Sequence, residues 1–423
     1  MVQRKSLTTR RFASAWLWLA VACAGRSPAG DWPQILGPHR TGVAAEDETL
    51  SDRWPDSGPQ ELWRRPVGRG YAGLAVAAGR GFLFHREGDR EIIEAVDAAT
   101  GKTLWRADQA TRFRPQVGGS DGPLCVPTVA ADRVITFGAQ GVLTCLDAAS
   151  GRQLWQRQTH REFDAAEGYF GAGSAPLVIG PRVIVNVGGR GDAGLVGFDL
   201  ESGEAVWQAT KDPASYAAPR AVLVGDRPHV LVVTRYRCLL LDPASGLIHW
   251  EFPFGMRGPT VNAATPLVFR DRDGNQRLLV TAAYGIGSVC ATFDTRAAVP
   301  VWQGTDSLAS QYCTPILRDG RLTCIDGRDD VPPTALKHID AATGDVLWQE
   351  PNFGYGTLLA ADGKLLAVKT DGELLLLRAS AGGVEFLGRA RPLPGTLRAL
   401  PALSAGRLYI RDDTTLVCLA VGR

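Results

Sequence analysis

The sequence predicts an all-β protein that folds as an eight-bladed β-propeller with four-stranded antiparallel blades. Two observations predict this fold: a turn motif that begins with aspartate recurs along the chain, and a second turn signal opens a β-rich run eight times. Both recur about every 40–50 residues, the length of one propeller blade. The 49 glycines and 26 prolines also fit a chain that is dense in turns.

The first motif begins with aspartate and ends with tryptophan. In its first copy, "DAATGKTLW" at residues 97–105, one apolar strand ends at the aspartate and another begins beyond Gly101. Aspartate can accept hydrogen bonds from the N–H groups of the turn, and glycine adopts a positive φ at low cost. This chemistry is typical of a hairpin whose loop ends in a left-handed residue. Six copies place a tryptophan eight residues after the aspartate: Asp97 and Trp105, Asp147 and Trp155, Asp199 and Trp207, Asp242 and Trp250, Asp294 and Trp302, and Asp340 and Trp348.

Two copies depart from the motif. "DTRAAVPVW" has Ala298 where five copies have glycine, so we expect a distorted turn there. A seventh copy, "RASAGGVEF", keeps Gly382 and has Phe386 in the tryptophan position. Because the tryptophans recur once per blade, we expect them to wedge between neighbouring sheets as a structural girdle and to take no direct part in chemistry.

The second signature gives the number of blades and the way in which the ring closes. Its eight turns are centred near residues 80, 132, 181, 226, 274, 320, 363 and 406. Eight outer strands are found only if Trp63 in "ELWRR" is counted, so the chain begins with an outer strand. We expect this strand to complete the last blade beside "TLVCLAVGR", which hides a sheet edge that would otherwise invite aggregation.

The N-terminus is typical of an export signal, with basic residues followed by the apolar run 12–24. The predicted organisation is a signal peptide over 1–29, a strap segment over 30–59 and the propeller over 60–423. We expect export to the periplasm or cell envelope, either after ordinary cleavage or as a lipoprotein anchored through Cys23. No later apolar run is long enough to span a membrane. Loss of residues 1–29 changes the net charge from +2 to −3 and leaves no basic patch for nucleic acid.

The cysteines follow no metal-binding or haem-binding spacing. Cys313 and Cys324 are the only pair whose oxidation to a disulfide is worth testing. Four others lie in apolar runs and are expected to be small buried hydrophobes: Cys145, Cys238, Cys290 and Cys418.

Residues 60–423 resemble the pyrroloquinoline-quinone (PQQ) repeat family, whose unit reads roughly "G.vya.d..G.l.AlDa.TGk..W". The segment "DWPQILGPHRTGV" at 31–43 resembles the lead-in of exported members, and we expect it to cross the ring with His39 and Arg40 at the surface. The family contains quinoprotein dehydrogenases and non-enzymatic scaffolds, among them the propeller lipoprotein of the outer-membrane β-barrel assembly machinery. Since both kinds share the fold, the fold cannot choose between them.

A binding pocket is expected where the loops before the inner strands converge at one mouth of the central channel. In the dehydrogenases this region holds PQQ, a Ca²⁺ ion and an aspartate base, and the resemblance makes Asp121 and Asn262 the only candidate metal ligands. The adjacent-cysteine disulfide and haem segment found among these enzymes have no counterpart here. The candidate pocket residues are Arg114, Asp121, Tyr169, Ser174, Tyr216, Asn262, Gln311, Tyr312 and Tyr355.

These observations favour an exported, monomeric, non-enzymatic scaffold that binds a protein or another envelope component. The alternative is a PQQ-dependent oxidoreductase of sugars or alcohols that uses the channel mouth with PQQ and Ca²⁺. A small-molecule ligand at the mouth is compatible with either interpretation.

Overall fold

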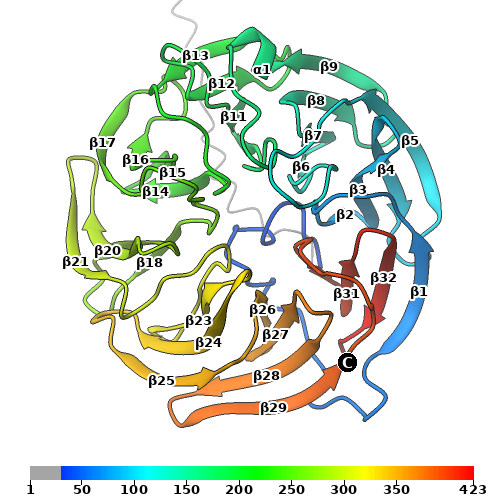
Figure 1. The fold of residues 1–423 in the computed structure, drawn as a ribbon, viewed down its shortest axis with the longest axis vertical. Helices are drawn as coiled ribbons and strands as arrows, with labels where there is room; N and C mark the ends of the chain where they lie inside the picture. The colour runs from blue at the N-terminus through cyan, green and yellow to red at the C-terminus, as the bar shows by residue number, and fades with distance from the viewer. Residues whose placement is uncertain (1–29) are drawn as a thin grey trace, which may run out of the picture.

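The computed structural model describes residues 30–423 as a ring of eight four-stranded antiparallel sheets (Figure 1). Each sheet is one blade, and the all-β eight-bladed prediction is confirmed. The single helix of the described residues is the short α1 (Thr159–Glu162), which follows the outer strand of the second blade.

Seven blades are formed by consecutive strands that run from the axis outward. Blades 1 to 4 consist of β2 (Ala75–Ala77), β3 (Arg80–Glu87), β4 (Arg90–Asp97) and β5 (Thr103–Ala110); β6 (Thr128–Ala130), β7 (Arg133–Phe137), β8 (Val142–Asp147) and β9 (Gln153–Gln158); β10 (Leu177–Ile179), β11 (Arg182–Asn186), β12 (Leu195–Asp199) and β13 (Ala205–Ala209); and β14 (Arg220–Val224), β15 (Arg227–Val233), β16 (Arg237–Leu241) and β17 (Ile248–Pro253). Blades 5 to 7 consist of β18 (Leu267–Arg270), β19 (Gln276–Ala282), β20 (Gly287–Phe293) and β21 (Ala298–Gly304); β22 (Ile316–Arg318), β23 (Arg321–Arg328), β24 (Val331–Asp340) and β25 (Val346–Pro351); and β26 (Gly356–Ala361), β27 (Lys364–Lys369), β28 (Leu374–Ser380) and β29 (Gly383–Ala390).

The eighth blade joins the two ends of the propeller. It has the order β1-β32-β31-β30, where β1 (Gln60–Pro66) precedes all other strands and β30 (Ala402–Ser404), β31 (Arg407–Arg411) and β32 (Thr415–Ala420) end the chain. Trp63 of β1 lies opposite Cys418 of β32 in an antiparallel pair. The predicted closure of the ring by an N-terminal strand is therefore confirmed.

The tryptophans link seven of the eight blades to the next in a girdle, and blade 7 has Phe386 in that position. The indole N–H of Trp155 donates to the carbonyl of Leu200 in the Asp turn of the next blade, at 2.9 Å. The ring also covers Gly203, where an added Cβ would lie 2.5 Å from the indole. Glycine is therefore needed both for its positive φ and for the close approach of the tryptophan. The same indole-to-carbonyl bond joins Trp63 to Ala98, Trp105 to Ala148, Trp207 to Pro243, Trp250 to Asp294, Trp302 to Ala341 and Trp348 to Ser380.

The turn that lacks glycine differs from the others, as predicted. In the first blade the N–H of Asp97 donates to the carbonyl of Lys102, whereas the N–H of Asp294 donates to that of Ala297. The tighter turn makes Ala298 the first residue of β21, and no left-handed residue is needed at that position.

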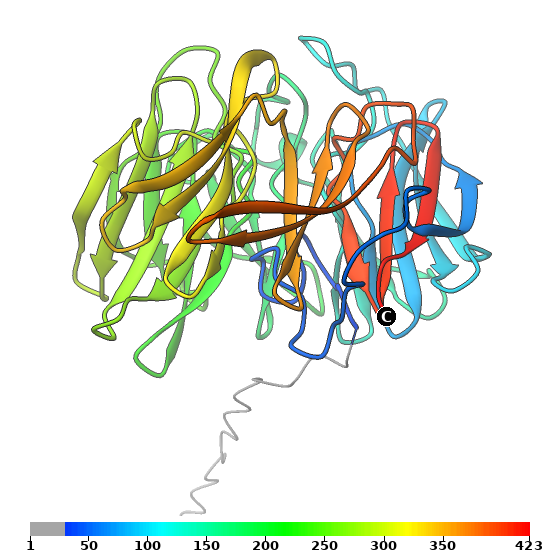
Figure 2. The ribbon, with the colours of Figure 1, turned by 90° about the horizontal axis from the view of Figure 1, so that it is seen from below.

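The strap, residues 30–59, lies across one face of the ring (Figure 2). Trp32 pairs with Val76 of β2, and Val43 pairs with Ala360 of β26. This strap face also carries turns between first and second strands, because Asp31 accepts a hydrogen bond from the N–H of Ala78. The opposite end of the ring is called the loop face here.

The surface position expected for Arg40 is wrong, although His39 is exposed. Arg40 is only 1% exposed, and its guanidinium reaches into the channel. There it donates to the carbonyls of Ala175 at 3.2 Å, Pro219 at 2.8 Å and Pro176. These carbonyls precede inner strands, and the sequence alone does not show that they converge on one side chain.

All seven cysteines in residues 30–423 are buried and free. Cys313 and Cys324 lie together, since the thiol of Cys324 contacts the carbonyl of Cys313 at 3.3 Å, but they form no disulfide. The predicted signal peptide and Cys23 lie outside the described residues. Within the described chain, no helix has the length and apolar character to cross a bilayer.

Candidate functional site

A cavity of about 440 Å³ occupies the channel on the loop face and is called the mouth cavity here. Its floor includes Ile35 of the strap, so the strap closes the end of the channel opposite the mouth. The walls are largely aromatic because loops from several blades bring rings to the axis. The aromatic residues are Tyr71, Phe170, Tyr216, Tyr284 and Tyr312.

Hydrogen bonds fix the orientation of two of these rings. The hydroxyl of Tyr216 accepts a hydrogen bond from the N–H of Phe170 at 3.2 Å. The amide nitrogen of Gln311 donates to the hydroxyl of Tyr284 at 2.8 Å. The amide oxygen of Gln311 in turn accepts from the N–H of Asp329 at 2.9 Å. The mouth is therefore a connected network and not a set of independent loops.

The carboxylates that line the mouth cavity have cationic partners. Asp329 pairs with Arg398 at 2.7 Å, and it also accepts from the hydroxyl of Thr370 at 2.7 Å. Asp330 accepts from the Nε of Arg328 at 3.0 Å, and this hydrogen bond lowers the pKa of its carboxyl. Asp329 consequently braces the loops of blades 6 to 8, whereas Asp330 is engaged within the hairpin of blade 6.

Arginines also cover tyrosine rings around the mouth. The guanidinium of Arg328 lies 4.2 Å from the centre of the Tyr284 ring, and that of Arg398 lies 5.7 Å from the Tyr71 ring. Such contacts are favourable when the cation lies within about 6 Å of the ring centre. The arginines of this region thus join an acidic residue on one side to an aromatic wall on the other.

One polar atom in the wall has no partner. The hydroxyl of Tyr312 is buried and forms no hydrogen bond with the described residues. Burial raises the pKa of this phenol well above its usual value, and the nearby carboxylate of Asp329 adds to the rise. Tyr312 is therefore a neutral donor at the wall of the cavity at neutral pH.

Three of the nine predicted pocket residues line the mouth cavity: Tyr216, Gln311 and Tyr312. Tyr169 lies beside it and lines two neighbouring hollows of about 740 and 360 Å³.

Three other predicted residues are buried and hold loop backbone. The hydroxyl of Ser174 donates to the carbonyl of Ala217 at 2.8 Å, and the amide of Asn262 donates to that of Thr234 at 3.0 Å. The hydroxyl of Tyr355 accepts from the N–H groups of Tyr312 at 2.8 Å and of Cys313 at 3.1 Å.

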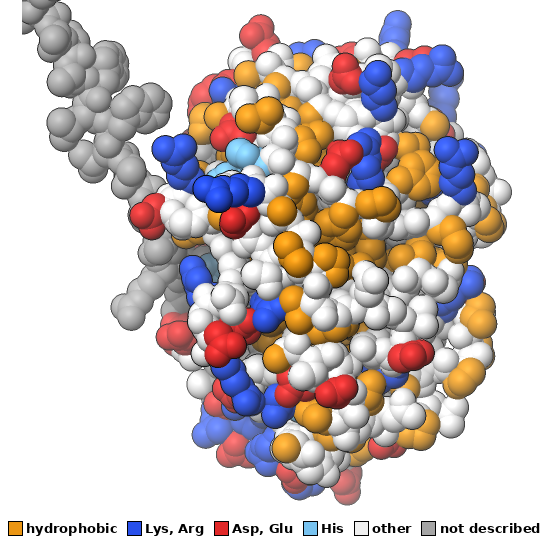
Figure 3. Space-filling model, turned by 90° about the vertical axis from the view of Figure 1, so that its left-hand side faces the viewer, with side chains coloured by type: hydrophobic (Ala, Val, Ile, Leu, Met, Phe, Trp, Pro, Cys, Tyr) orange, Lys and Arg blue, Asp and Glu red, His pale blue; other side chains and the backbone are white. Residues whose placement is uncertain are grey.

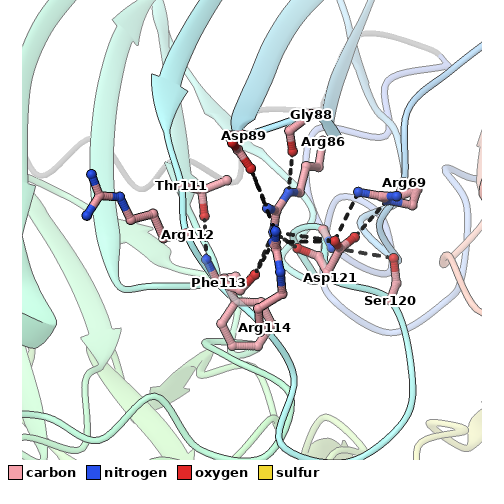
Figure 4. Close-up of polar contacts among 12 residues, drawn as sticks. Arg69, Arg86, Gly88, Asp89, Thr111, Arg112, Phe113, Arg114, Ser120 and Asp121 are labelled. Atoms are coloured by element: carbon pink, nitrogen blue, oxygen red, sulfur yellow. Dashed lines mark hydrogen bonds and ion pairs between the residues drawn. The ribbon is translucent and has the colours of Figure 1, made fainter.

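The last two predicted residues, Arg114 and Asp121, belong to an arginine-rich cluster between the first two blades (Figure 4). Asp121 pairs with Arg69 at 2.7 Å and lies 3.6 Å from the buried guanidinium of Arg86. Arg114 is mostly exposed and donates to the carbonyl of Phe113 at 2.9 Å. Neither Arg114 nor Asp121 lines the mouth cavity, and their contacts secure the loop between the blades.

The prediction missed several residues of the mouth. Tyr71 and Arg398 come from "VGRGYAGL" and "RPLPGTLRAL", which also precede inner strands and carry the same signal as the loops that were chosen. Tyr284 and Asp329 come from hairpins between second and third strands, which point to the same face. The loops before inner strands and the hairpins between second and third strands therefore both contribute residues to the mouth.

The residues present do not fit the calcium ion that accompanies PQQ. Ca²⁺ takes six to eight oxygen ligands, but no group of three or more acidic, histidine or cysteine residues within 30–423 is placed to hold a metal ion. Asp121 is engaged by Arg69, so of the two candidates only the amide oxygen of Asn262, which has no hydrogen-bond partner among the described residues, is left as a free ligand. These residues therefore do not provide the oxygen ligands that catalysis with PQQ and calcium would need.

Comparison with known proteins identifies the family. The sequence model of the family described as outer membrane protein assembly factor BamB matches residues 55–210 and 88–350, more than half of the chain. The chain belongs to this family of PQQ-like repeat propellers.

The relatives include both outer membrane protein assembly factors and alcohol dehydrogenases. BamB from Bordetella pertussis is 24% identical over 399 residues, which span 85% of this chain and 94% of that protein. The quinohemoprotein alcohol dehydrogenase ADH IIB from Pseudomonas putida is 33% identical over 130 residues, 30% of this chain and 18% of the dehydrogenase. The crystal structure of BamB from Moraxella catarrhalis superposes with a TM-score of 0.63 at 18% identity and covers 86% of this chain and 99% of that one, which shows a shared fold.

Proposed function

We propose that the protein is a non-enzymatic scaffold, exported to the cell envelope, whose loop face binds other proteins. The relative named as an assembly factor matches along 94% of its length, whereas the dehydrogenase matches along 18%. The donor set of the mouth also supports the proposal, because its carboxylates are engaged by arginines and are not free to act as bases or calcium ligands.

The observation that carries the proposal is an apolar rim around the mouth cavity. Val117 and Met256 are 53% and 46% exposed, and they line a hollow of about 740 Å³ together with Tyr169 and Tyr284. Exposed apolar side chains gathered beside a concavity mark interaction sites. Methionine has a flexible side chain that can fit partner surfaces of different shape. Tyrosine and methionine are both enriched at protein–protein interfaces.

The outer rim of the ring is a weaker candidate surface. Hydrophobic side chains gather on the side seen in Figure 3, over the outer strands at the left of Figure 1, and Val299 and Val301 of β21 are exposed. Pro300 lies between them on the edge strand. Proline on an edge removes an N–H donor and discourages the pairing of another strand.

Site-specific photo-crosslinking would test the binding surface. A photoreactive residue at position 256 is expected to capture a defined partner in cells, whereas one at Leu223, 61% exposed on β14, is not. Met256→Asp should abolish the crosslink formed from position 117, and Leu223→Asp should leave it unchanged. Equal capture from positions 256 and 223 would contradict a loop-face site.

The enzymatic alternative has its own test. Purified protein would be mixed with PQQ and Ca²⁺ and examined for a bound quinone spectrum and for dye reduction with alcohols and aldoses. We expect neither, and substrate-dependent dye reduction would replace the scaffold proposal with a quinoprotein oxidoreductase. Mass analysis of the mature N-terminus would separately distinguish cleavage of a signal from a lipid on Cys23.

A further inference from the structure

Two arginines are buried next to one another where the strap meets the channel. Arg40 of the strap is 1% exposed, and Arg220, the first residue of β14, is 9% exposed. The guanidinium of Arg40 donates at 2.8 Å to the carbonyl of Pro219, the residue immediately before Arg220. The two side chains therefore place two positive charges in one small part of the molecule.

No carboxylate of residues 30–423 forms an ion pair with either arginine. The partners of Arg40 are neutral: the amide oxygen of Gln34 at 2.8 Å, the hydroxyl of Thr128 and backbone carbonyls. Arg220 donates only to the carbonyl of Pro266, at 3.2 Å, so its Nε and Nη2 groups have no partner among the described residues. The thiol of the adjacent Cys125 does not compensate, because burial raises its pKa and keeps it neutral.

Other fully buried arginines have compensating acids. Arg86 lies 3.5 Å from Asp89 and 3.6 Å from Asp121. Arg411 has the negative charges of Asp412 and Asp413 close by. The pair formed by Arg40 and Arg220 thus departs from the pattern that the rest of the protein follows.

An uncompensated buried charge is strongly unfavourable. Burial is the main reason why the pKa of Arg40 is lowered to about 9, and the charge of Arg220 contributes to this fall. Burial likewise lowers the pKa of Arg220 to about 10. Both groups nevertheless remain protonated at neutral pH, so the two charges persist together in the folded protein.

We propose that the channel binds a small inorganic anion between the guanidinium groups of Arg40 and Arg220. The free N–H groups of Arg220 would donate to it, and guanidinium groups are well suited to halides and to oxyanions such as phosphate. The anion supplies the missing negative charge and connects the strap to the fourth blade. Its binding therefore stabilises the closed end of the channel.

Thermal unfolding at constant ionic strength tests this site. Sodium gluconate, whose anion is bulkier than a halide or phosphate, would be replaced stepwise by sodium chloride, bromide or phosphate. The wild-type melting temperature is expected to rise along a saturable curve, by about 3 °C when the anion is about 100-fold above its Kd. Arg220→Met should lose the saturable rise because it removes the free donors, while Arg257→Met, which alters an exposed arginine of the loop face, should keep it.

The comparison between variants separates binding from general salt effects. Phosphate stabilises folded proteins nonspecifically, so only the difference between wild type and Arg220→Met measures the site. Chloride and bromide acting without phosphate would identify a halide site, and phosphate acting alone would identify an oxyanion site. An identical response in wild type and Arg220→Met would overturn the proposal.

Crystals grown in bromide provide a direct second measurement. If halides raise the melting temperature, an anomalous peak between the two guanidinium groups, lost in Arg220→Met, is the expected result; if only phosphate does, crystals grown in phosphate should show it there instead. A bound ion without a saturable change in melting temperature would mean an adventitious ion only, and it would overturn the proposal, as would the absence of any ion at this place in crystals grown with the anion that raises the melting temperature.

Discussion

The tryptophan girdle and the mouth cavity are built on the same eight blades, but only the girdle repeats. Each link of the girdle joins an indole N–H to a carbonyl of the next Asp turn, as in Trp105 to Ala148 and Trp155 to Leu200. The mouth has no such unit, because the loops that form it differ in sequence and vary widely in length. The difference shows that repetition maintains the ring while irregular loops create the surface available for binding.

Removal of one indole should produce the largest effect and test how far the girdle holds the ring. Trp155→Ala leaves a cavity against Gly203 and an unpaired carbonyl at Leu200. We expect a loss of about 3–5 kcal/mol in the free energy of unfolding and a melting temperature lower by several degrees. Leu104→Ala on outer strand β5 is the control, since Leu104 is half exposed. An unchanged melting curve for Trp155→Ala would contradict the structural role of the girdle.

The irregular side of the molecule should lose stability at a higher pH than the Asp turns of the girdle, whose aspartates have pKa values lowered from 3.8. His160 of α1 packs edge-on against Phe137, with 6.0 Å between ring centres, and burial lowers its pKa from 6.5 to about 4. As the pH falls below 6.5 the unfolded chain binds the proton first, so stability is lost between pH 6.5 and 4. The expected loss is about 2–3 kcal/mol. Urea unfolding measured across this pH range should show that His160→Gln removes that part of the acid sensitivity.

The girdle could be predicted because its chemistry is local. Aspartate, glycine and tryptophan at fixed spacing specify a turn and the ring that packs on it, as with Gly151 and Trp105. The distorted turn at Ala298 could also be predicted, because the usual turn needs glycine at this position.

The mouth could be predicted only in part, because its geometry depends on tertiary contacts. Tyr216 and Gln311 were recognised from their loops, but Ser174 and Asn262 in similar loops turn inward to satisfy backbone groups. Arg40 is buried although the sequence predicts it at the surface, and arginine is rarely fully buried without a partner. The carbonyls that bind it come from loops distant in sequence, so no local pattern reveals them.

The regular turn at Gly344 and the irregular turn at Ala298 should respond in different ways when glycine and alanine are exchanged. Gly344 has φ +81°, and an added Cβ would lie 2.7 Å from the ring of Trp302. Gly344→Ala should therefore cost about 1–2 kcal/mol. Ala298→Gly should bring no gain and should cost about 0.5–1 kcal/mol, because Ala298 is already in a strand. Chemical unfolding of both variants measures the difference, and a stabilised Ala298→Gly would show that this turn can adopt the regular form.

The smallest effect on stability is expected at the mouth itself. The hydroxyl of Tyr312 has no hydrogen-bond partner among the described residues, whereas its ring packs against Tyr355 with 4.7 Å between centres. Tyr312→Phe keeps the ring and removes only the unpaired group, so the free energy of unfolding should change by less than about 0.5 kcal/mol. A loss above about 1 kcal/mol in urea unfolding would mean that the hydroxyl is bonded in the folded protein. Near-neutrality would instead mark it as a donor that folding leaves unused, in a wall where most other polar groups already serve the fold.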